Sequence, residues 1–345
     1  MRAIVFRAPN RVELVEMPRP VLTADTDALV KVRLAGICGT DLHVVRGDFP
    51  GMQPGMVLGH EFVGEVVEVG SAVKRFHVGD RVMSSDFTAC GRCSWCDDQQ
   101  HWQCAERAFF GTGTAFGPAL SGAQAEFVRV PHADTTLGAM PAGCSDEAGL
   151  LMADNLATGW TAAERARLAA GDCVVVVGGG AVGQLAALSA QTLAAGIVIV
   201  VEPAPARQAF ARQQGSVAVH PDEAPALVRR LSEGRGADAV LEAVGNAAAL
   251  DLAMALVRSQ GNVVSVGAHA AERWPLPVAR AFAAELTVGF AIGNAIRLRQ
   301  RLLRLVASGA FDPTVVIDAR GTLADGPALY DALAAQRRLK AVISP

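Results

Sequence analysis

The sequence predicts an α/β protein with two domains, one a small barrel or sandwich of β-strands and the other a doubly wound parallel sheet. Three observations lead to this prediction. Short strand-like segments fill residues 1 to about 150, strands alternate with alanine-rich helices after about residue 146, and a glycine-rich turn joins the first of these strands to its helix. With 345 residues, the chain is long enough for both domains to bury a core.

In the first part, strands are expected at residues 4–6, 12–15, 28–34, 64–69, 80–82 and 125–130. Each segment is short and largely apolar, and glycines and prolines separate the segments. This spacing is typical of a barrel or a sandwich.

In the second part, strands expected at 174–177, 197–201, 218–220, 239–242 and 262–266 alternate with helices expected at 184–195, 204–214, 224–232 and 247–258. Such alternation produces a parallel sheet with helices on both faces. A basic amphipathic helix is expected at 297–307 and a last strand at 341–344. We expect the arginines of that helix to lie on a solvated face: Arg297, Arg299, Arg301 and Arg304.

The segment from Cys173 to Glu202 predicts a dinucleotide-binding turn of the Rossmann type. After an uncharged β-branched strand, Gly178, Gly180 and Gly183 form the pattern G-x-G-x-x-G. These glycines permit a tight turn, a close approach of backbone to a pyrophosphate, and close packing of the helix on the strand. The helix N-terminus, with Ala181 and Val182, offers free N–H groups to phosphates. Glu202 follows 19 residues after the last glycine, where a carboxylate can accept hydrogen bonds from a ribose.

Composition and charge exclude several classes of protein. No charged residue lies between Asp172 and Glu202, but three consecutive glycines and several polar residues break this interval, so it does not predict a membrane span. The net charge of −3 gives no basic surface for nucleic acid. The first residues alternate like a strand and lack the anatomy of a signal peptide, so we expect a cytoplasmic protein without a membrane or nucleic-acid partner.

Four of the seven cysteines lie within 15 residues and predict a structural zinc site. Four closely spaced thiolates can complete a tetrahedron around one ion, whereas disulfides and an iron–sulfur cluster are the alternatives. We expect Asp86, Asp97 and Asp98 to be solvated and His101 to lie on the surface of this lobe, which covers about 86–108. The expected ligands are Cys90, Cys93, Cys96 and Cys104.

Cys38 and His60 are candidates for a second metal site. Each stands beside a glycine in the β-rich part, and two ligands from different loops leave room for the open position that a catalytic zinc needs. Taken alone, such a pair is more often part of a core than of a metal site.

The chain resembles the zinc-dependent medium-chain alcohol dehydrogenases. The residues that carry the resemblance are Cys38-Gly-x-Asp, Gly59-His60-Glu61, the four-cysteine lobe and the glycine turn, in this order and at these spacings. The resemblance covers essentially the whole chain and implies a GroES-like catalytic domain formed by residues 1–156 and 298–345. The Rossmann domain, residues 157–297, would be inserted between these two parts.

The resemblance also implies roles for single residues. Asp154, within Met152-Ala-Asp-Asn, matches the third zinc ligand of the secondary-alcohol and formaldehyde dehydrogenase branch, and Glu61 can approach the zinc as a fourth ligand. Thr40 and His43 match the proton relay of the family, and histidine suits the solvent end because its pKa lies near neutral pH. Two zinc ions per chain are therefore expected, one catalytic and one structural.

The expected cofactor is NAD, because Glu202 would repel the 2′-phosphate of NADP. Arg207 matches a basic residue that NAD-dependent relatives keep near the adenosine ribose. Further cofactor contacts are expected from Thr158, Val266 and Ile292. The short chain is similar to the tetramer-forming bacterial branch, so we expect a homotetramer, with a homodimer as the alternative.

The predicted reaction is hydride transfer between an alcohol, secondary or small aliphatic, and NAD. Pocket candidates are Thr40, Phe87, Phe109, Phe110, Trp160 and the loop 292–294. A polyol, threonine or aldehyde dehydrogenase of the same superfamily remains an alternative. A zinc-free quinone reductase or a non-catalytic nucleotide-binding protein is disfavoured by the cysteine lobe and by Cys38 and His60.

Overall fold

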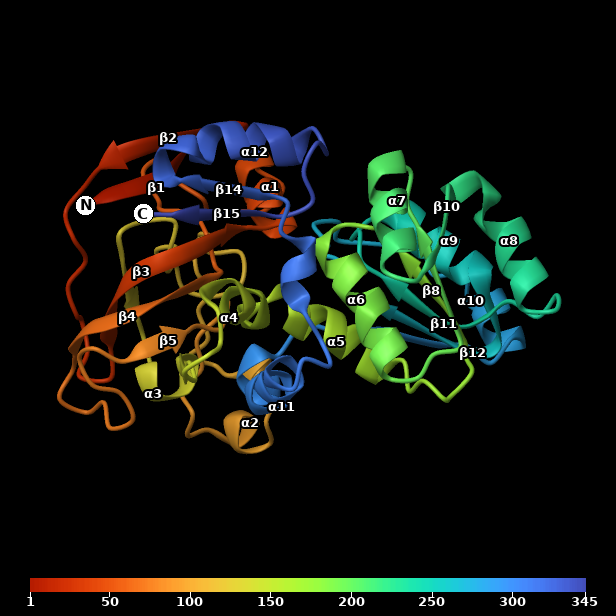
Figure 1. The fold of residues 1–345 in the computed structure, drawn as a ribbon, viewed down its shortest axis with the longest axis horizontal. Helices are drawn as coiled ribbons and strands as arrows, with labels where there is room; N and C mark the ends of the chain where they lie inside the picture. The colour runs from red at the N-terminus through yellow and green to blue at the C-terminus, as the bar shows by residue number, and fades with distance from the viewer. The chain divides into compact units, whose positions relative to one another are not determined.

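The protein forms two compact units (Figure 1), as seen in a computed structural model that describes residues 1–345. Unit 1 contains Met1–Ala157 and Asn294–Pro345, and unit 2 contains Thr158–Gly293. The first boundary falls one residue, and the second four residues, from the sequence-based boundaries. The second differs because α11 (Ala295–Ala307) begins earlier than expected, where the Asn294 side chain accepts a hydrogen bond from Arg297 N.

Unit 1 is built on a seven-stranded sheet that both ends of the chain contribute to. The order is β14 (Ala319–Thr322), β15 (Ala341–Ser344), β3 (Ala28–Ile37), β4 (Phe62–Val69), β5 (Arg81–Met83) and β7 (Gly138–Ala139), and β6 (Phe127–Val130) also pairs with β3. β1 (Arg2–Ala8) and β2 (Arg11–Glu16) form a separate antiparallel pair. The pairing of β15 with β3 brings the last strand beside the end of β3, where the candidate metal site begins (Figure 1).

Unit 2 is a six-stranded parallel sheet. Its order is β10 (Val217–Val219), β9 (Ile197–Val201), β8 (Cys173–Val177), β11 (Ala237–Glu242), β12 (Val257–Ser265) and β13 (Thr287–Phe290). The alternation of side chains along β8 and β9 explains why both strands are uncharged. Val174 and Val176 face a core that includes α6 (Ala181–Thr192), whereas Val175 and Val177 face a core that includes α9 (Ala247–Leu256).

The remaining helices connect these strands or cover unit 1. They are α1 (Gly39–Arg46), α2 (Ser94–Asp97), α3 (Ala133–Thr136), α4 (Asp146–Ala153), α5 (Asn155–Arg165), α7 (Pro205–Gln213), α8 (Ala224–Leu231), α10 (Val278–Ala283) and α12 (Gly326–Ala334). No helix has the length and apolar character needed to cross a membrane.

Arg299 corrects one expectation about α11. Its side chain is buried rather than solvated, and its guanidinium donates to the backbone oxygens of Leu137 and Thr136, both at 2.7 Å. Burial lowers the pKa of Arg299 to about 9. The other three arginines of the helix are exposed, as expected.

Candidate metal centres and cofactor turn

Cys38 follows β3 directly and stands at the N-cap position of α1. The carboxylate of Asp41, in the first turn of the helix, accepts a hydrogen bond from Cys38 N at 2.9 Å. An acid at this position satisfies a free N–H group and complements the helix dipole. The local sequence therefore fixes the backbone of Cys38, and its thiol is buried. Burial, followed by the charges of Asp154 and Glu61, raises the pKa of this thiol.

His60 is fully buried just before β4, after a glycine that the turn requires. Gly59 has a φ of +92°, and a Cβ there would lie 2.4 Å from a carbon of Gln124. His60 Nδ1 lies 3.0 Å from Asp41 Oδ1, an arrangement that places the proton on Nδ1 and leaves the lone pair on Nε2. His60 Nε2 is buried and makes no hydrogen bond, although Asp154 Oδ2 lies 3.4 Å away as an ion-pair contact. Burial lowers the pKa of His60, but the charge of Asp41 and the interactions with Asp154 and Cys38 together outweigh it, and the net direction is upward.

Asp154 lies between α4 and α5, where the backbone leaves helical geometry (φ −148°, ψ −72°). Its Oδ2 is 3.5 Å from Cys38 Sγ and 3.4 Å from His60 Nε2. Burial raises the pKa of Asp154, yet its interactions with His60 and the charge of Lys340 together make the net direction downward.

The first candidate metal cluster consists of Cys38, His60, Glu61 and Asp154, whose donor atoms all lie within 4.8 Å of one another. Sulfur, nitrogen and carboxylate donors are the ligands that zinc takes in proteins. The uncommitted lone pair of buried His60 Nε2 is costly unless an ion binds it, so the residues present fit a zinc ion.

Lys340 and Asn155 complete the surroundings of Glu61, and neither was singled out from the sequence. Lys340 Nζ forms an ion pair with Glu61 Oε2, and Asn155 Nδ2 donates to Glu61 Oε1 at 2.6 Å. All three side chains are buried. Burial raises the pKa of Glu61 to about 7, although the charge of Lys340 acts in the opposite direction.

Thr40 and His43 are three residues apart on α1, so they share one side of the helix. The Thr40 side chain is half-buried. His43 is partly exposed, and its Nδ1 lies 2.8 Å from Asp48 Oδ2 and 3.0 Å from Arg46 Nη2.

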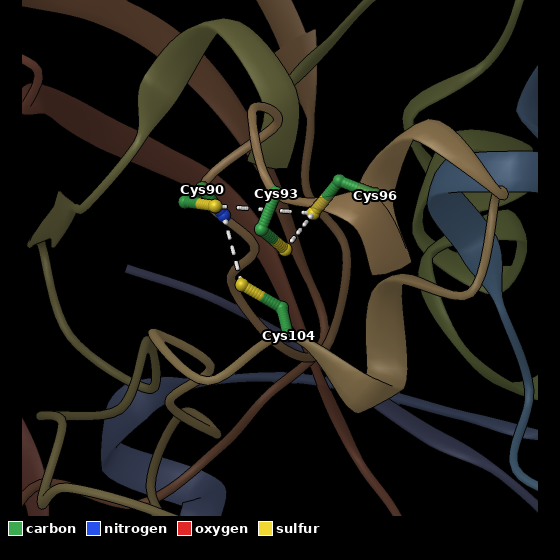
Figure 2. Close-up of side chains that lie close together, drawn as sticks. All are labelled: Cys90, Cys93, Cys96 and Cys104. Atoms are coloured by element: carbon green, nitrogen blue, oxygen red, sulfur yellow. Dashed lines mark hydrogen bonds between the residues drawn. The ribbon is translucent and has the colours of Figure 1, made fainter.

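Figure 2 shows the second cluster, formed by the four cysteines of the lobe. Cys96 Sγ lies 3.6 Å from Cys93 Sγ and 4.0 Å from Cys90 Sγ, and Cys104 Sγ accepts a hydrogen bond from Cys90 N at 3.3 Å. All four thiols are free, and their sulfurs lie within 4.8 Å of one another. Four convergent sulfurs without a disulfide fit one tetrahedral zinc ion with no open position.

Two expectations for this lobe were wrong. His101 is buried rather than on the surface, because its Nδ1 lies 3.2 Å from Asn294 Oδ1 and Asn294 Nδ2 donates to Gln99 O. Asp86 is also buried, and Ser85 Oγ donates to its carboxylate at 3.1 Å. Burial and the charge of Asp154 raise the pKa of Asp86 well above its ordinary value. Asp97 and Asp98 are exposed, as expected.

Aromatic rings lie beside the first cluster. The ring of Phe109 is 5.2 Å from the ring of His60, centroid to centroid, and also contacts Trp102 and Phe116. Phe87 contacts Trp102 in turn. The other two aromatic pocket candidates, Phe110 and Trp160, are buried.

The glycine turn of unit 2 lies between β8 and α6. A Cβ at Gly183 would lie 1.8 Å from the oxygen of Gly178, so the helix packs on the strand at a distance that only glycine allows. A Cβ at Gly180 would meet no atom within 4 Å. The packing of the protein therefore does not explain the glycine at 180, whereas the approach of a phosphate does. The residues fit a dinucleotide.

Glu202 follows β9 at the same edge of the sheet. Its Oε2 accepts a hydrogen bond from Gly179 N at 2.8 Å and its Oε1 one from Ala204 N at 2.9 Å. Arg207 Nη1 lies 3.9 Å from Glu202 Oε2. The predicted acid and base are therefore brought together beside the glycine turn.

Three other predicted cofactor residues belong to unit 2. Val266 follows β12 and Ile292 follows β13, so both stand at the carboxyl edge of the sheet with the glycine turn. Thr158 is buried in α5, and a Cβ at Gly293 would lie 2.3 Å from its hydroxyl oxygen. Glu242, which was not singled out from the sequence, is fully buried at this edge and accepts hydrogen bonds from Val244 N and Gly245 N.

Comparisons with known proteins agree with this geometry. Residues 24–141 match the family model described as the alcohol dehydrogenase GroES-like domain, and residues 181–308 match the one described as zinc-binding dehydrogenase. An alcohol dehydrogenase of Cupriavidus necator is 32% identical over 100% of this chain and 99% of its own length. The chain belongs to the zinc-dependent medium-chain dehydrogenase/reductase family.

Other members of this family support the assignment of the fold. The structure of an alcohol dehydrogenase from Thermus sp. ATN1 has a TM-score of 0.94 at 36% identity and covers 100% of this chain and 99% of that chain. A sorbitol dehydrogenase of Bacillus subtilis is 32% identical over 81% of this chain and 78% of its own length. The GroES-like and Rossmann-type domains predicted from the sequence are confirmed, and the protein is a zinc-type dehydrogenase with a nicotinamide cofactor.

Proposed function

We propose that the protein oxidises a secondary or small aliphatic alcohol with NAD, or carries out the reverse reduction. The observation that carries this proposal is the convergence of the donor atoms of Cys38, His60 and Asp154, with His60 Nε2 buried, without a hydrogen bond and 3.4 Å from Asp154 Oδ2. Three protein ligands leave one position open, which is the arrangement of a catalytic rather than a structural zinc. The four-cysteine cluster supplies the structural counterpart.

In this proposal zinc supplies Lewis acidity that lowers the pKa of an alcohol, and NAD accepts the hydride. The residues of the chain position these groups and move the proton. Asp41 fixes the tautomer of His60. The Thr40 hydroxyl would accept a hydrogen bond from the alcohol and so hold its proton in place, and His43, partly exposed on the same side of α1, is placed to exchange a proton with solvent.

A second candidate substrate class is a diol or polyol, and Asp86 favours it. This buried carboxyl has no cationic partner, and the charges that act on it most strongly are those of Asp154 and His60. Ser85 Oγ donates to this carboxyl but supplies no positive charge, and a buried carboxyl without a charge partner is costly unless it serves a polar ligand. A second hydroxyl on the substrate would provide that partner.

The test is an NADH-absorbance screen over primary, secondary, cyclic and polyhydroxy alcohols, combined with a zinc assay. We expect two zinc ions per chain and turnover that Cys38→Ser nearly abolishes without loss of NAD binding. Asp86→Leu should lower kcat/KM for diols relative to simple secondary alcohols if the diol class is correct, and leave the ratio unchanged otherwise. A protein without zinc, oxidising alcohols in the presence of a chelator, would contradict the proposal.

We also propose that the chain forms a homo-oligomer. β13 is an edge strand of unit 2 with unpaired backbone groups on one side, and Phe282 and Phe290 near it are 85% and 55% exposed. An exposed apolar edge of this kind is a liability unless another chain covers it. Light scattering should give the mass of a tetramer or a dimer, and a monomer at micromolar concentration would exclude it.

A further inference from the structure

A lysine occupies the interior of unit 1 directly behind the first metal cluster. Lys340 is 1% exposed and precedes β15, which pairs with β3 so that Val342 stands opposite Gly36. Its amino group forms an ion pair with the carboxylate of Glu61, a side chain that is fully buried. Removing both charged groups from water is costly, and the loss of either partner would leave the other charge buried and unpaired.

The backbone of β3 makes room for this ion pair. A Cβ at Gly36 would lie 1.8 Å from Glu61 Oε2 and 3.1 Å from Lys340 Nζ. The glycine two residues before Cys38 is therefore required by the position of the Glu61 carboxylate, and any side chain there would displace it.

Each carboxylate oxygen of Glu61 accepts a hydrogen bond from another side chain. Oε2 is held by Lys340 and Oε1 by Asn155 Nδ2 at 2.6 Å. Asn155 Nδ2 also lies 2.9 Å from Asp154 Oδ2 and 3.5 Å from Cys38 Sγ. The amide of Asn155 thus both orients Glu61 and contacts two of the three proposed zinc ligands.

Charge balance requires the lysine as well. With the thiol ionised, Cys38, Glu61, Asp154 and Asp41 place four negative charges around one divalent cation, and all four side chains are buried. Lys340 offsets one of these charges. Without it, the carboxylate of Glu61 would find its strongest available cation in the metal, which its donor atom can reach within the 4.8 Å cluster.

We propose that Lys340 is a positioning residue that, with Asn155, holds Glu61 outside the inner coordination sphere of the metal and so keeps the fourth position open for substrate. The inference rests on the proposed function of the Cys38, His60 and Asp154 site. Whether the protein supplies three or four ligands to the metal then depends on Lys340, beside the C-terminal strand, and not on Glu61 alone.

The test uses the whole protein with both zinc ions replaced by cobalt(II), and follows the change in its visible spectrum on titration with imidazole at one neutral pH. The four-cysteine site has no open position, so this difference spectrum reports only on the first cluster. Lys340→Met should weaken imidazole binding by about tenfold or more, which corresponds to about 1.4 kcal/mol. Lys340→Arg, which keeps the cation, should stay near the wild-type affinity.

Two further variants make the test decisive. Glu61→Gln should leave the wild-type affinity for imidazole unchanged, and Lys340→Met with Glu61→Gln should restore it. If Glu61→Gln alone strengthens imidazole binding, Glu61 already binds the metal and the inference is wrong. If Lys340→Met lowers the melting temperature but leaves imidazole affinity unchanged, the ion pair is merely structural. If Cys38→Ser leaves the difference spectrum intact, the metal lies elsewhere and the proposed function itself fails.

Discussion

Glu202 is held at the carboxyl edge of β9 by two backbone N–H groups, so its charge is fixed in place beside the glycine turn. We expect Glu202→Ser to reduce the preference for NAD over NADP by about tenfold or more, because it removes a repulsion worth at least about 1.4 kcal/mol from a 2′-phosphate. The ratio of kcat/KM for the two cofactors measures this effect.

Glu223→Ser is the matched control, since Glu223 is an exposed glutamate of the same unit. It should leave the cofactor ratio unchanged. An unchanged ratio in Glu202→Ser would remove Glu202 from the cofactor site.

Predictions from the sequence were least accurate for the roles and burial of single residues. The four cysteines could be named from their spacing, whereas Cys38 and His60 were preferred as ligands only with the help of the family resemblance, and Asp154 rested on that resemblance. Lys340 could not, because its role depends on a strand pairing that crosses almost the whole chain. Asp86 and His101 were placed in solvent because polar residues in a loop usually are, and only tertiary contacts decide otherwise.

At the scale of elements, the period of the hydrophobic pattern was enough to predict the long, buried strands but not the short ones. β8 and β9 were predicted because each is a continuous run of β-branched residues. β7 and β13 were not, because they have only two and four residues and include a glycine. Such strands form because a neighbouring strand supplies hydrogen bonds, which leaves no signal in their own sequence.

Asp238 joins three strands of unit 2 and makes the stability of this sheet depend on pH. Its carboxylate accepts hydrogen bonds from Cys173 N, at 2.7 Å, and from Arg258 Nε, at 2.6 Å. Burial raises the pKa of Asp238, but the hydrogen bonds from Arg258 and Cys173 N and the charges of nearby arginines together make the net direction downward. A carboxyl with a lowered folded-state pKa stabilises the protein above its unfolded pKa, and this contribution disappears as pH falls through the folded pKa.

We therefore expect Asp238→Asn to lower the free energy of unfolding by about 1–3 kcal/mol at neutral pH. The difference from wild type should shrink as pH falls below about 4, near the unfolded pKa of aspartate. Urea unfolding of both proteins across that range measures it, with the exposed Asp222→Asn as the control. A difference that is constant with pH would show that the ionised carboxylate is not what stabilises these strand ends.

At the scale of the whole molecule, the two candidate metal clusters both belong to unit 1, whereas the glycine turn belongs to unit 2. The chain leaves unit 1 at Ala157 and returns at Asn294, so two segments distant in sequence build the first unit. The resemblance to a known family implied this division, whereas composition alone gave only the number of domains.

This division predicts that metal removal affects the two units differently. A structural zinc contributes folding free energy, on the order of 10 kcal/mol in small zinc domains, so chelation should destabilise unit 1. ADP-ribose, which would contact the glycine turn and Glu202 but no metal ligand, should still bind the metal-free protein with an affinity within about twofold of the original, a difference of about 0.4 kcal/mol. Calorimetry before and after chelation, with ADP-ribose titrated into each sample, separates these effects.

Two cysteine variants distinguish the metal sites within the same experiment. Cys93→Ser should lower the melting temperature and the yield of folded protein, because the four-cysteine cluster holds the lobe together. Cys38→Ser should abolish turnover with a smaller change in melting temperature, since β3 and α1 retain their hydrogen bonds to Asp41 and to neighbouring strands. If the two variants lost stability and activity to the same extent, the separation into a catalytic and a structural zinc would be wrong. If metal removal also abolished ADP-ribose binding, the two units would not be independent.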